Sequence, residues 1–334
     1  MKAFGFNSND SHARLIELNT PQATAHDLLV KIDAIAVNPV DTKVIAGIKE
    51  ALTSPKIVGW DVAGTVTAIG DDVELFKVGD KVFYAGDVTR PGCYASHQLV
   101  DERIVGHAPK TLSAVEAAAM PLTSITAWEA LFSRLKIIAD LDAGKNILII
   151  GGAGGVGSIA IQLAKTIANL NVIATASRTE SETWCKELGA DYVLNHHSDL
   201  VVQYRTLGIG DPDYILCLNN TDRHFASMAE LIAPQGMICS IVGTQEKHDL
   251  DCLKSKSAAF VWEFMFTRPM FKTSDMSAQH HLLNEVSRLL DAGKLRSTLT
   301  SVIGPINSKN ITTAHQQLLT GSTLGKFALT AIID

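Results

Sequence analysis

The sequence predicts an α/β protein that combines a mostly β region with a doubly wound parallel sheet. Residues 1–110 carry short β-rich runs, such as LLVKIDAIAV and DKVFYAG, separated by Gly, Asp and Pro turn signals. From residue 146 onward apolar strands alternate with helices, an order typical of a parallel sheet covered by helices. A glycine-rich turn, GGAGGVGS, joins the first of these strands to its helix.

Length and composition are those of a globular protein with two domains. The chain has 334 residues, which is long for a single core. Hydrophobic residues make up 46% of it and charged residues 19%, with a formal charge of −6, which is unlike disordered, fibrous or nucleic-acid-coating proteins. We therefore expect no nucleic-acid partner.

The N-terminal stretch MKAFGFNSND has no apolar segment of signal-peptide length, so we expect a cytoplasmic protein. The uncharged window 146–164 has nearly the length of a membrane span, but its clustered glycines would break a continuous helix, so we expect no membrane association. The five cysteines are far apart and form no C-x-x-C pair. We expect them to be reduced, mostly buried, and not part of a zinc knuckle.

The middle and end of the chain supply the remaining elements. LSAVEAAAMPLTSITAWEALFSRL predicts two helices broken near Pro121, and the domain boundary is placed there. The strands NILIIGG, NVIATAS, YVLN, DYILCL and GMICSIVG follow, with helices between them. SAAFVWEFM then predicts another buried strand, SAQHHLLNEVSRLLDAGKL a helix that ends at Gly293, and GKFALTAII a final strand.

The glycine-rich turn predicts a dinucleotide site. Gly152, Gly154 and Gly157, with Gly155 and Val156 between them, satisfy G-x-G-x-x-G directly after a strand and before a helix. Glycines there permit a tight turn and close approach of the backbone to a pyrophosphate, and the helix N-terminus offers N–H donors to it. The alternative is a glycine-rich turn that binds nothing.

The end of the second strand of this sheet favours NADPH over NADH. An acidic residue there would bind the adenosine ribose and repel a 2′-phosphate, but this chain has Ser177 and Arg178. A hydroxyl and a guanidinium suit a phosphate monoester. The alternative is that Arg178 is a solvated residue at a helix start, with Glu180 and Glu182 close by.

A longer pattern carries a family resemblance. GWDVAGTVTAIGDDVELFKVGDKV has the spacing G-x-[ED]-x-x-G-x-V-x-x-x-G-x-x-V-x(5)-G-D-x-V and resembles the signature of the medium-chain dehydrogenase/reductase superfamily. The chain is most similar to its quinone oxidoreductase-like branch, close to proteins described as zinc-type alcohol dehydrogenase-like. The resemblance implies a GroES-like catalytic domain (1–119 and 295–334), a Rossmann NADP-binding domain (120–294), and homodimers formed through the Rossmann domains.

The zinc ligands of that superfamily are not matched. Asn38, in NPVD, stands where zinc members have their first thiolate, and Trp60 stands where they have an imidazole. Nothing in PLTSITAWEAL matches the third ligand, and the four-cysteine loop is absent. Because catalytic zinc needs three protein ligands, we expect no zinc. The histidine pairs 196–197 and 280–281 are not expected to bind metal, and the second pair is expected at the surface.

Without a Lewis acid, a quinone or an enone is a better hydride acceptor than an ordinary ketone, because charge spreads to a distal oxygen. Asn38 is the candidate donor to that oxygen, or else it fixes the turn before Pro39. Trp60 is expected on the substrate side. Thr126 matches a threonine that contacts the nicotinamide amide in similar reductases, or else bonds its own helix. Lys43 either steadies an enolate or pairs with Asp41 or Asp61.

Further cofactor contacts are assigned by position. His196 falls where many quinone oxidoreductases place a tyrosine near the 2′-phosphate. Lys326, in GKFAL, either approaches the cofactor phosphate or is a turn lysine. Trp262 and Phe264 either wall the pocket or belong to the core. The remaining candidates follow strand ends, where open α/β sheets bind ligands: Asn219, Val242, Gly243 and Thr244.

The sequence thus predicts a zinc-independent, NADPH-dependent reductase of a small-molecule quinone or α,β-unsaturated carbonyl. Two alternatives stay open. One is a zinc-dependent medium-chain alcohol dehydrogenase or aldehyde reductase, and the other is a non-catalytic NADPH-binding sensor.

Overall fold

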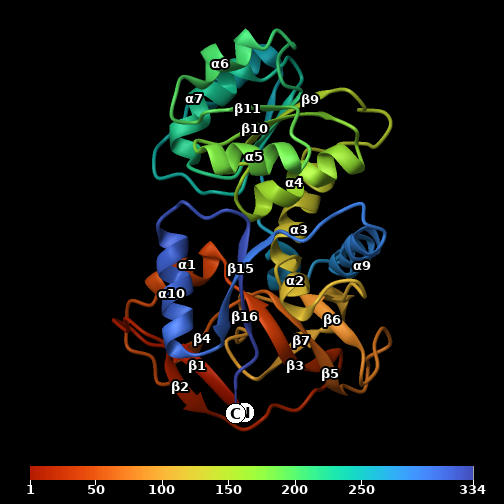
Figure 1. Cartoon of the computed structure of the whole chain (residues 1–334), viewed down its shortest axis with the longest axis vertical. Coiled ribbons are helices and arrows are strands. Elements are labelled where there is room, and N and C mark those ends of the chain that lie inside the picture. Colours follow the sequence, from red (N-terminus) through yellow and green to blue (C-terminus); the bar gives the residue numbers. More distant parts are fainter. Residues whose placement is uncertain (334) are drawn as a thin grey trace. The chain divides into compact units, whose positions relative to one another are not determined.

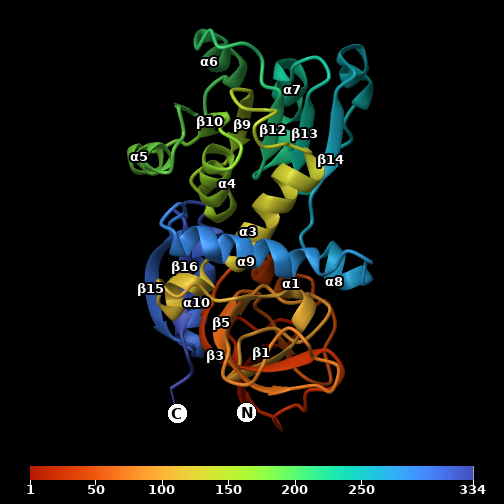
Figure 2. The ribbon, with the colours of Figure 1, turned by 90° about the vertical axis from the view of Figure 1, so that its right-hand side faces the viewer.

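The computed structural model describes residues 1–333, which fold into two compact units (Figures 1 and 2). Unit 1 comprises residues 1–125 together with the chain from residue 266 onward, and unit 2 comprises residues 126–265. The predicted division into 1–119 with 295–334, and 120–294, therefore differs from the structure, which places residues 120–125 and 266–294 in unit 1.

Unit 1 is built on β-sheets. Its larger sheet has the order β15-β16-β3-β5-β6-β8, with β7 also paired to β3. The bounds are β3 Asp27–Ala36, β5 Val62–Ile69, β6 Lys81–Tyr84, β7 His97–Asp101, β8 Val105–His107, β15 Leu299–Pro305 and β16 Lys326–Thr330. A small sheet joins β1 Lys2–Phe6 to β2 Arg14–Glu17 and β4 Lys56–Ile57. Antiparallel pairing of β16 with β3 brings the C-terminal strand into this unit.

Short helices cover the sheets of unit 1: α1 Pro39–Ala46, α2 Ala114–Ala118, α8 Thr267–Phe271, α9 Ala278–Asp291 and α10 Ser308–Leu319, with a 3₁₀ turn at Glu102–Ile104. The helix α9 packs on β8, where a Cβ on Gly106 would lie 2.6 Å from Cβ of Leu283. His280 is 8% exposed and its Nδ1 lies 2.7 Å from the carbonyl oxygen of Val105. The expectation of a surface pair at 280–281 is therefore wrong for His280, and α9 belongs to unit 1.

Unit 2 holds the doubly wound parallel sheet, in the order β11-β10-β9-β12-β13-β14, and Figure 2 shows β10, β9, β12, β13 and β14 in this succession. The bounds are β9 Asn146–Ile150, β10 Asn171–Thr175, β11 Tyr192–Leu194, β12 Tyr214–Cys217, β13 Met237–Ser240 and β14 Ala259–Trp262. The predicted Rossmann architecture is confirmed. The last strand is an edge strand, however, and Trp262 is 48% exposed rather than buried.

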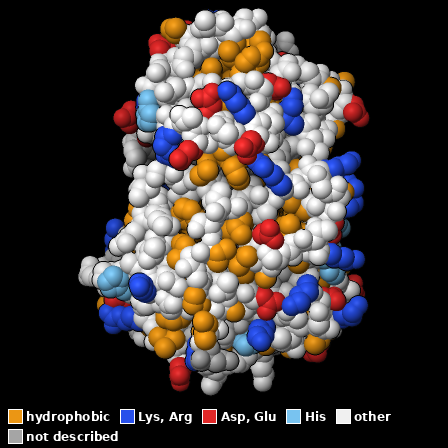
Figure 3. Space-filling model, viewed as in Figure 1, with side chains coloured by type: hydrophobic (Ala, Val, Ile, Leu, Met, Phe, Trp, Pro, Cys, Tyr) orange, Lys and Arg blue, Asp and Glu red, His pale blue; other side chains and the backbone are white. Residues whose placement is uncertain are grey.

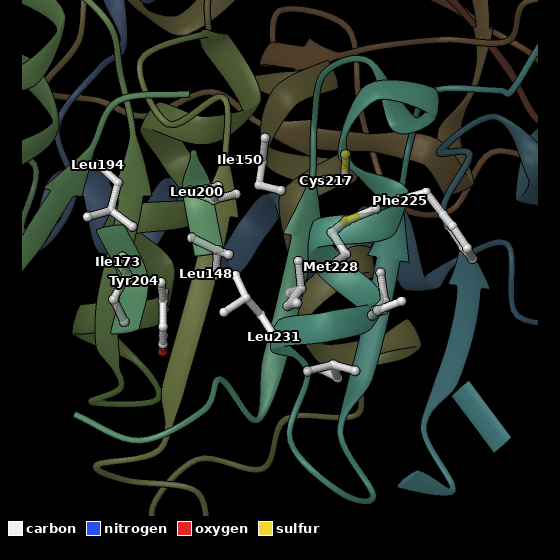
Figure 4. Close-up of a cluster of buried hydrophobic side chains, with 14 of the residues drawn as sticks. Leu148, Ile150, Ile173, Leu194, Leu200, Tyr204, Cys217, Phe225, Met228 and Leu231 are labelled. Carbon is white, nitrogen blue, oxygen red and sulfur yellow. The ribbon is translucent and has the colours of Figure 1, made fainter. Parts of the chain in front are cut away.

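Helices cover both faces of this sheet: α4 Gly155–Thr166, α5 Thr179–Glu187, α6 Leu200–Thr206 and α7 Thr221–Leu231, with a 3₁₀ helix at Leu250–Lys256. Figure 4 shows side chains of α6 and α7, including Tyr204 and Met228, gathered over Leu148 and Ile173 of the sheet. All five residues of β9 are buried, because a parallel strand at the centre of such a sheet is covered on both faces.

The predicted helix break near Pro121 is confirmed, since α3 runs from Pro121 to Trp128 after α2 has ended. Unit 2 begins within α3, at Thr126, and a π-helix, Glu129–Arg134, directly follows α3 there. Within the described residues, no helix has the length and apolarity that crossing a membrane requires. Four of the five cysteines are buried and Cys252 is exposed. Acidic and basic side chains are interspersed on the face shown in Figure 3.

Candidate functional site

The glycine-rich turn of unit 2 has the form that a dinucleotide phosphate requires. Gly151 adopts a φ of 90°, and its N–H donates to Oγ1 of Thr175 at 3.0 Å. A Cβ on Gly157 would lie 2.4 Å from the carbonyl oxygen of Gly151, so the helix α4 can approach the turn only without a side chain there. At Gly154, the N-cap of α4, the nearest atom to a Cβ would be 3.8 Å away. The turn is therefore tight toward the protein and open at Gly154, which fits a ligand phosphate at the helix N-terminus.

Other predicted cofactor residues lie at the same carboxyl edge of the sheet. Asn219, after β12, is exposed, and its Cβ would be 3.5 Å from a Cβ on Gly151. The segment Val242, Gly243 and Thr244 follows β13, where Oγ1 of Thr221 donates to the carbonyl oxygen of Val242 at 2.5 Å. The structure thus brings these loops together with the glycine-rich turn, while their contacts with a cofactor stay predictions.

Basic side chains lie next to this edge. Arg178 is exposed at the N-cap of α5, next to the half-buried Ser177, and His196 is half-buried after β11. Burial lowers the pKa of His196, and the charges of His197, Arg223 and Arg178 lower it further. His224 is buried, and its pKa falls to about 4 through burial and the charges of Arg223 and His196.

Sequence reasoning missed Arg223. It is exposed in the first turn of α7, where Asn220 caps the helix by accepting from the N–H of Arg223 at 3.1 Å. A cation in the first turn of a helix opposes the helix dipole, and this was the available signal in the sequence that could have singled out Arg223.

In unit 1, Asn38 is held by charged partners. It lies between β3 and α1 and is 1% exposed. Its backbone N–H donates to Oδ2 of Asp41 at 2.9 Å, and its Nδ2 donates to Oδ2 of Asp61 at 2.8 Å. Its Oδ1 accepts a hydrogen bond from Nζ of Lys326. Hydrogen bonds therefore fix the backbone N–H of Asn38 as well as the nitrogen and the oxygen of its side-chain amide.

Lys326 was predicted from the sequence to approach the cofactor phosphate, or else to be a turn lysine. In the structure it binds other groups. The residue is 4% exposed, and its Nζ donates to Oδ2 of Asp61 at 2.9 Å and to the carbonyl oxygen of Val37 at 2.8 Å. With the bond to Asn38, all three N–H groups of the ammonium are used. We therefore withdraw Lys326 from the phosphate site and place it in the network around Asn38.

Asp61 is the counter-ion of this network. It is fully buried, and its Oδ1 accepts from the N–H of Leu122 at 2.7 Å, which ties the start of α3 to the site. Burial raises the pKa of Asp61, and the Lys326 ammonium and the Asn38 amide act against that rise. The pairing of Lys43 with Asp61 that the sequence left open does not occur, because Lys326 takes that position and Lys43 is exposed on α1.

A second buried chain of hydrogen bonds begins at Asp41, the acceptor of the Asn38 backbone N–H. The Tyr94 hydroxyl donates to Oδ2 of Asp41 at 2.8 Å and lies 2.8 Å from Nε2 of His315. Burial raises the pKa of Asp41 to about 7 and lowers that of His315 to about 4. Tyr94 and His315 were missed because 53 and 221 positions separate them from their partners, and no local pattern encodes that contact.

Trp60 and Thr126 are both buried. Trp60 is 0% exposed; its Nε1 donates to the carbonyl oxygen of Asp87 at 3.1 Å, and its ring packs edge-on against Phe266. Thr126 is 5% exposed in α3. Their roles toward substrate and nicotinamide, and that of Lys43 toward an enolate, stay predictions.

The residues at the zinc-ligand positions do not fit zinc. Both polar ends of the Asn38 amide are bonded to Asp61 and Lys326, and an indole such as Trp60 offers no ligand lone pair. The ammonium of Lys326 also brings a positive charge into this network. In residues 1–333 we find no group of three His, Cys, Asp or Glu side chains placed to hold a metal ion.

Family comparisons match both parts of the chain. The family described as alcohol dehydrogenase GroES-like domain matches residues 24–111, and the family described as zinc-binding dehydrogenase matches residues 155–291.

Individual relatives cover nearly the whole chain. A zinc-type alcohol dehydrogenase-like protein of Staphylococcus aureus is 46% identical over 95% of this chain and 94% of its own length. A 2-methylene-furan-3-one reductase of Solanum lycopersicum is 31% identical over 92% of this chain and 73% of its own.

Solved structures match this chain over nearly its whole length as well. A putative zinc-dependent alcohol dehydrogenase from Rhizobium etli is 48% identical in sequence, and the match covers 100% of this chain and 99% of that protein's chain with a TM-score of 0.95. The quinone oxidoreductase of Coxiella burnetii is 27% identical, with 99% of each chain covered and a TM-score of 0.81. Signature, two-unit fold and relatives agree: the chain belongs to the medium-chain dehydrogenase/reductase superfamily and, within it, to the quinone oxidoreductase-like branch.

Proposed function

We propose that this oxidoreductase is a zinc-independent, NADPH-dependent reductase that transfers a hydride to a quinone or an α,β-unsaturated carbonyl. One observation carries the proposal. Where zinc members have their first metal ligand, this chain has a buried neutral amide, Asn38, whose orientation is fixed by Asp61 and Lys326. A fixed N–H donor suits an oxygen that gains charge during the reaction, without a metal.

Several features support NADPH as the cofactor. The glycine-rich turn fits a pyrophosphate, and Gly151, Gly154 and Gly157 would hold it. The end of β10 is followed by Ser177 and Arg178 rather than by an acid. The charges of Arg178 and Arg223 both act on His196, and this concentration of positive charge supports the proposal of an additional phosphate at this edge of unit 2.

When bound, NADPH supplies a hydride. The Asn38 amide then donates a hydrogen bond to the oxygen on which negative charge develops, the carbonyl oxygen of an enone or of a quinone. A proton from solvent completes the two-electron reduction. The relative named as a 2-methylene-furan-3-one reductase supports an unsaturated ketone as one class of acceptor for this chain.

The test is a scan of acceptors with purified protein. NADPH oxidation is followed at a fixed wavelength with a 1,4-benzoquinone, an enone such as cyclohexenone and, as a comparison, the saturated ketone cyclohexanone. We expect turnover with the first two and little with the third, and higher affinity for NADPH than for NADH.

Elemental analysis separates the competing functions, because relatives 46% and 48% identical carry zinc in their descriptions. Stoichiometric zinc that is lost together with activity on chelation would overturn the proposal in favour of an alcohol dehydrogenase. Tight NADPH binding without turnover of any acceptor would favour a sensor.

We also propose that the chain forms a homodimer through unit 2. Its edge strand β14 is open on one side, and Trp262 and Phe264, at 48% and 47% exposure, present apolar surface there. Light scattering during size-exclusion chromatography should give twice the chain's 35.9 kDa, and Trp262→Asp should give the monomer. A wild-type monomer at micromolar concentration would contradict this.

A further inference from the structure

The amide of Asn38 has a hydrogen to spare. Its Nδ2 carries two hydrogens, and the structure gives it one acceptor, Oδ2 of Asp61 at 2.8 Å. Within residues 1–333 no second acceptor for Nδ2 is found. The residue is 1% exposed, and a buried donor hydrogen left without an acceptor costs free energy. The second hydrogen is therefore the one that a substrate oxygen would use.

Two opposite charges decide which way this amide points. Lys326 donates to Oδ1, and the carboxylate of Asp61 accepts from Nδ2. Turning the amide over would aim Oδ1 at the carboxylate and the N–H groups at the ammonium, so both contacts would become repulsive. Since Nζ of Lys326 is also tied to Asp61 at 2.9 Å, the three groups form a closed triangle that holds one orientation.

The same cation affects the strength of the donor. An ammonium bonded to an amide oxygen draws electron density from the amide nitrogen, and hydrogen bonds in a buried chain polarise one another. Lys326, Asn38 and Asp61 are 4%, 1% and 0% exposed, so water does not screen this effect. The N–H that remains on Nδ2 is therefore a stronger donor with Lys326 in place than without it, while the Asp61 carboxylate on the other hydrogen acts in the opposite direction.

We propose that Lys326 is the positioning residue of the reductase site: it fixes the orientation of the Asn38 amide and strengthens its free N–H toward the substrate oxygen. This inference rests on the proposed function only for the identity of that oxygen. The fixed orientation of the amide is a property of the chain itself.

The first experiment observes the amide without any reaction. In protein labelled with ¹⁵N-asparagine, the Asn38 side-chain pair is assigned by its loss in Asn38→Ala. Slow rotation about the amide C–N bond gives every asparagine two proton signals. We expect a separation larger than that of a solvated asparagine, with the proton bonded to Asp61 shifted downfield, and a smaller separation in Lys326→Met. A wild-type pair with only the separation of a solvated asparagine, or a pair unaffected by Lys326→Met, would overturn the inference even if the protein reduces quinones.

The second experiment is a double-mutant cycle on activity with benzoquinone. We expect Lys326→Met to lower kcat about 10-fold or more, with the KM for NADPH unchanged, and Asn38→Ala to lower it about 100-fold. In the Asn38→Ala background, Lys326→Met should have little further effect. An equal effect in both backgrounds, or a rise confined to the KM for NADPH, would overturn the role.

Folding is controlled separately, because Lys326→Met leaves the carboxylate of Asp61 buried without its cation. The double variant Lys326→Met/Asp61→Asn removes both charges, so it should fold, and it should show the same fall in kcat as Lys326→Met. If it keeps the wild-type activity, Lys326 is only a structural ion-pair partner. Lys309→Met, an exposed lysine on α10, is the matched control and should behave as wild type.

Discussion

The Tyr94 hydroxyl lies 2.8 Å from both Oδ2 of Asp41 and Nε2 of His315, and so links an acid and a base inside unit 1. Asp41 has a pKa raised to about 7 by burial, and His315 has one lowered to about 4 by burial. At pH 5 the folded chain therefore carries the proton on Asp41, whereas the unfolded chain carries it on His315. The number of protons bound is the same, so the two contributions to the pH dependence of stability oppose each other.

Replacing Asp41 with Asn should expose the contribution of His315. An imidazole whose pKa drops from 6.5 to about 4 on folding binds fewer protons when folded, so stability is lost as pH falls below 6.5. The free energy of unfolding of Asp41→Asn should thus rise between pH 4 and 6.5 by on the order of 2 kcal/mol more than that of the wild type. Urea unfolding at a series of pH values measures it, and parallel curves would contradict it.

Replacing His315 with Gln should do the opposite. The remaining carboxyl has a folded pKa of about 7 against an ordinary 3.8, so the folded chain binds more protons within that range. Its stabilising effect is full below pH 3.8 and is lost as pH rises through 7. Unfolding curves of His315→Gln should therefore show stability that falls from pH 4 to 7, and a rise would show that Asp41 is ionised in the folded chain.

These residues also show which parts of the structure could be predicted from the sequence. The sheet of unit 2 and its glycine-rich turn were predictable, because periodicity and the G-x-G-x-x-G pattern are local. The network around Asn38 was not, since Lys326 joins it across 288 positions through the pairing of β16 with β3. Likewise α9 resembles any helix of an α/β domain in sequence, and only its packing on β8 assigns it to unit 1.

A carboxyl pair in unit 2 gives a prediction at alkaline pH. Glu263 is 2% exposed, and burial and the nearby Glu129 raise its pKa to about 8, while Nε of Arg134 donates to its Oε2 at 2.7 Å. Because the folded pKa is raised above the ordinary 4.5, stability falls as pH rises toward 8. Because Gln cannot ionise, the melting temperature of Glu263→Gln should fall less between pH 6 and 9 than that of the wild type. The control is Glu230→Gln, at an exposed position. Equal falls in melting temperature for wild type and Glu263→Gln would be evidence against a raised pKa of Glu263.

Two glycines of the turn should respond differently to alanine. A Cβ on Gly157 would be 2.4 Å from a backbone oxygen, so Gly157→Ala should lower the melting temperature as well as cofactor affinity. A Cβ on Gly154 meets no protein atom closer than 3.8 Å, so Gly154→Ala should keep the stability and still weaken NADPH binding about 10-fold or more. Calorimetric titration and thermal unfolding separate the two effects. Unchanged binding in Gly154→Ala would place the phosphate elsewhere.

The cationic residues near the carboxyl edge should discriminate between the two cofactors. Arg178→Ala and Arg223→Ala each remove a charge that acts on His196, and a guanidinium paired with a phosphate contributes about 1.5–3 kcal/mol. We expect either change to weaken NADPH binding about 10- to 100-fold while NADH binding changes less than threefold. Arg205, near the C-terminal end of α6, pairs with Asp211, and Arg205→Ala is the matched control. If Arg178→Ala and Arg223→Ala weaken both cofactors equally, these arginines contact no 2′-phosphate; if only Arg178→Ala discriminates, Arg223 serves the fold alone.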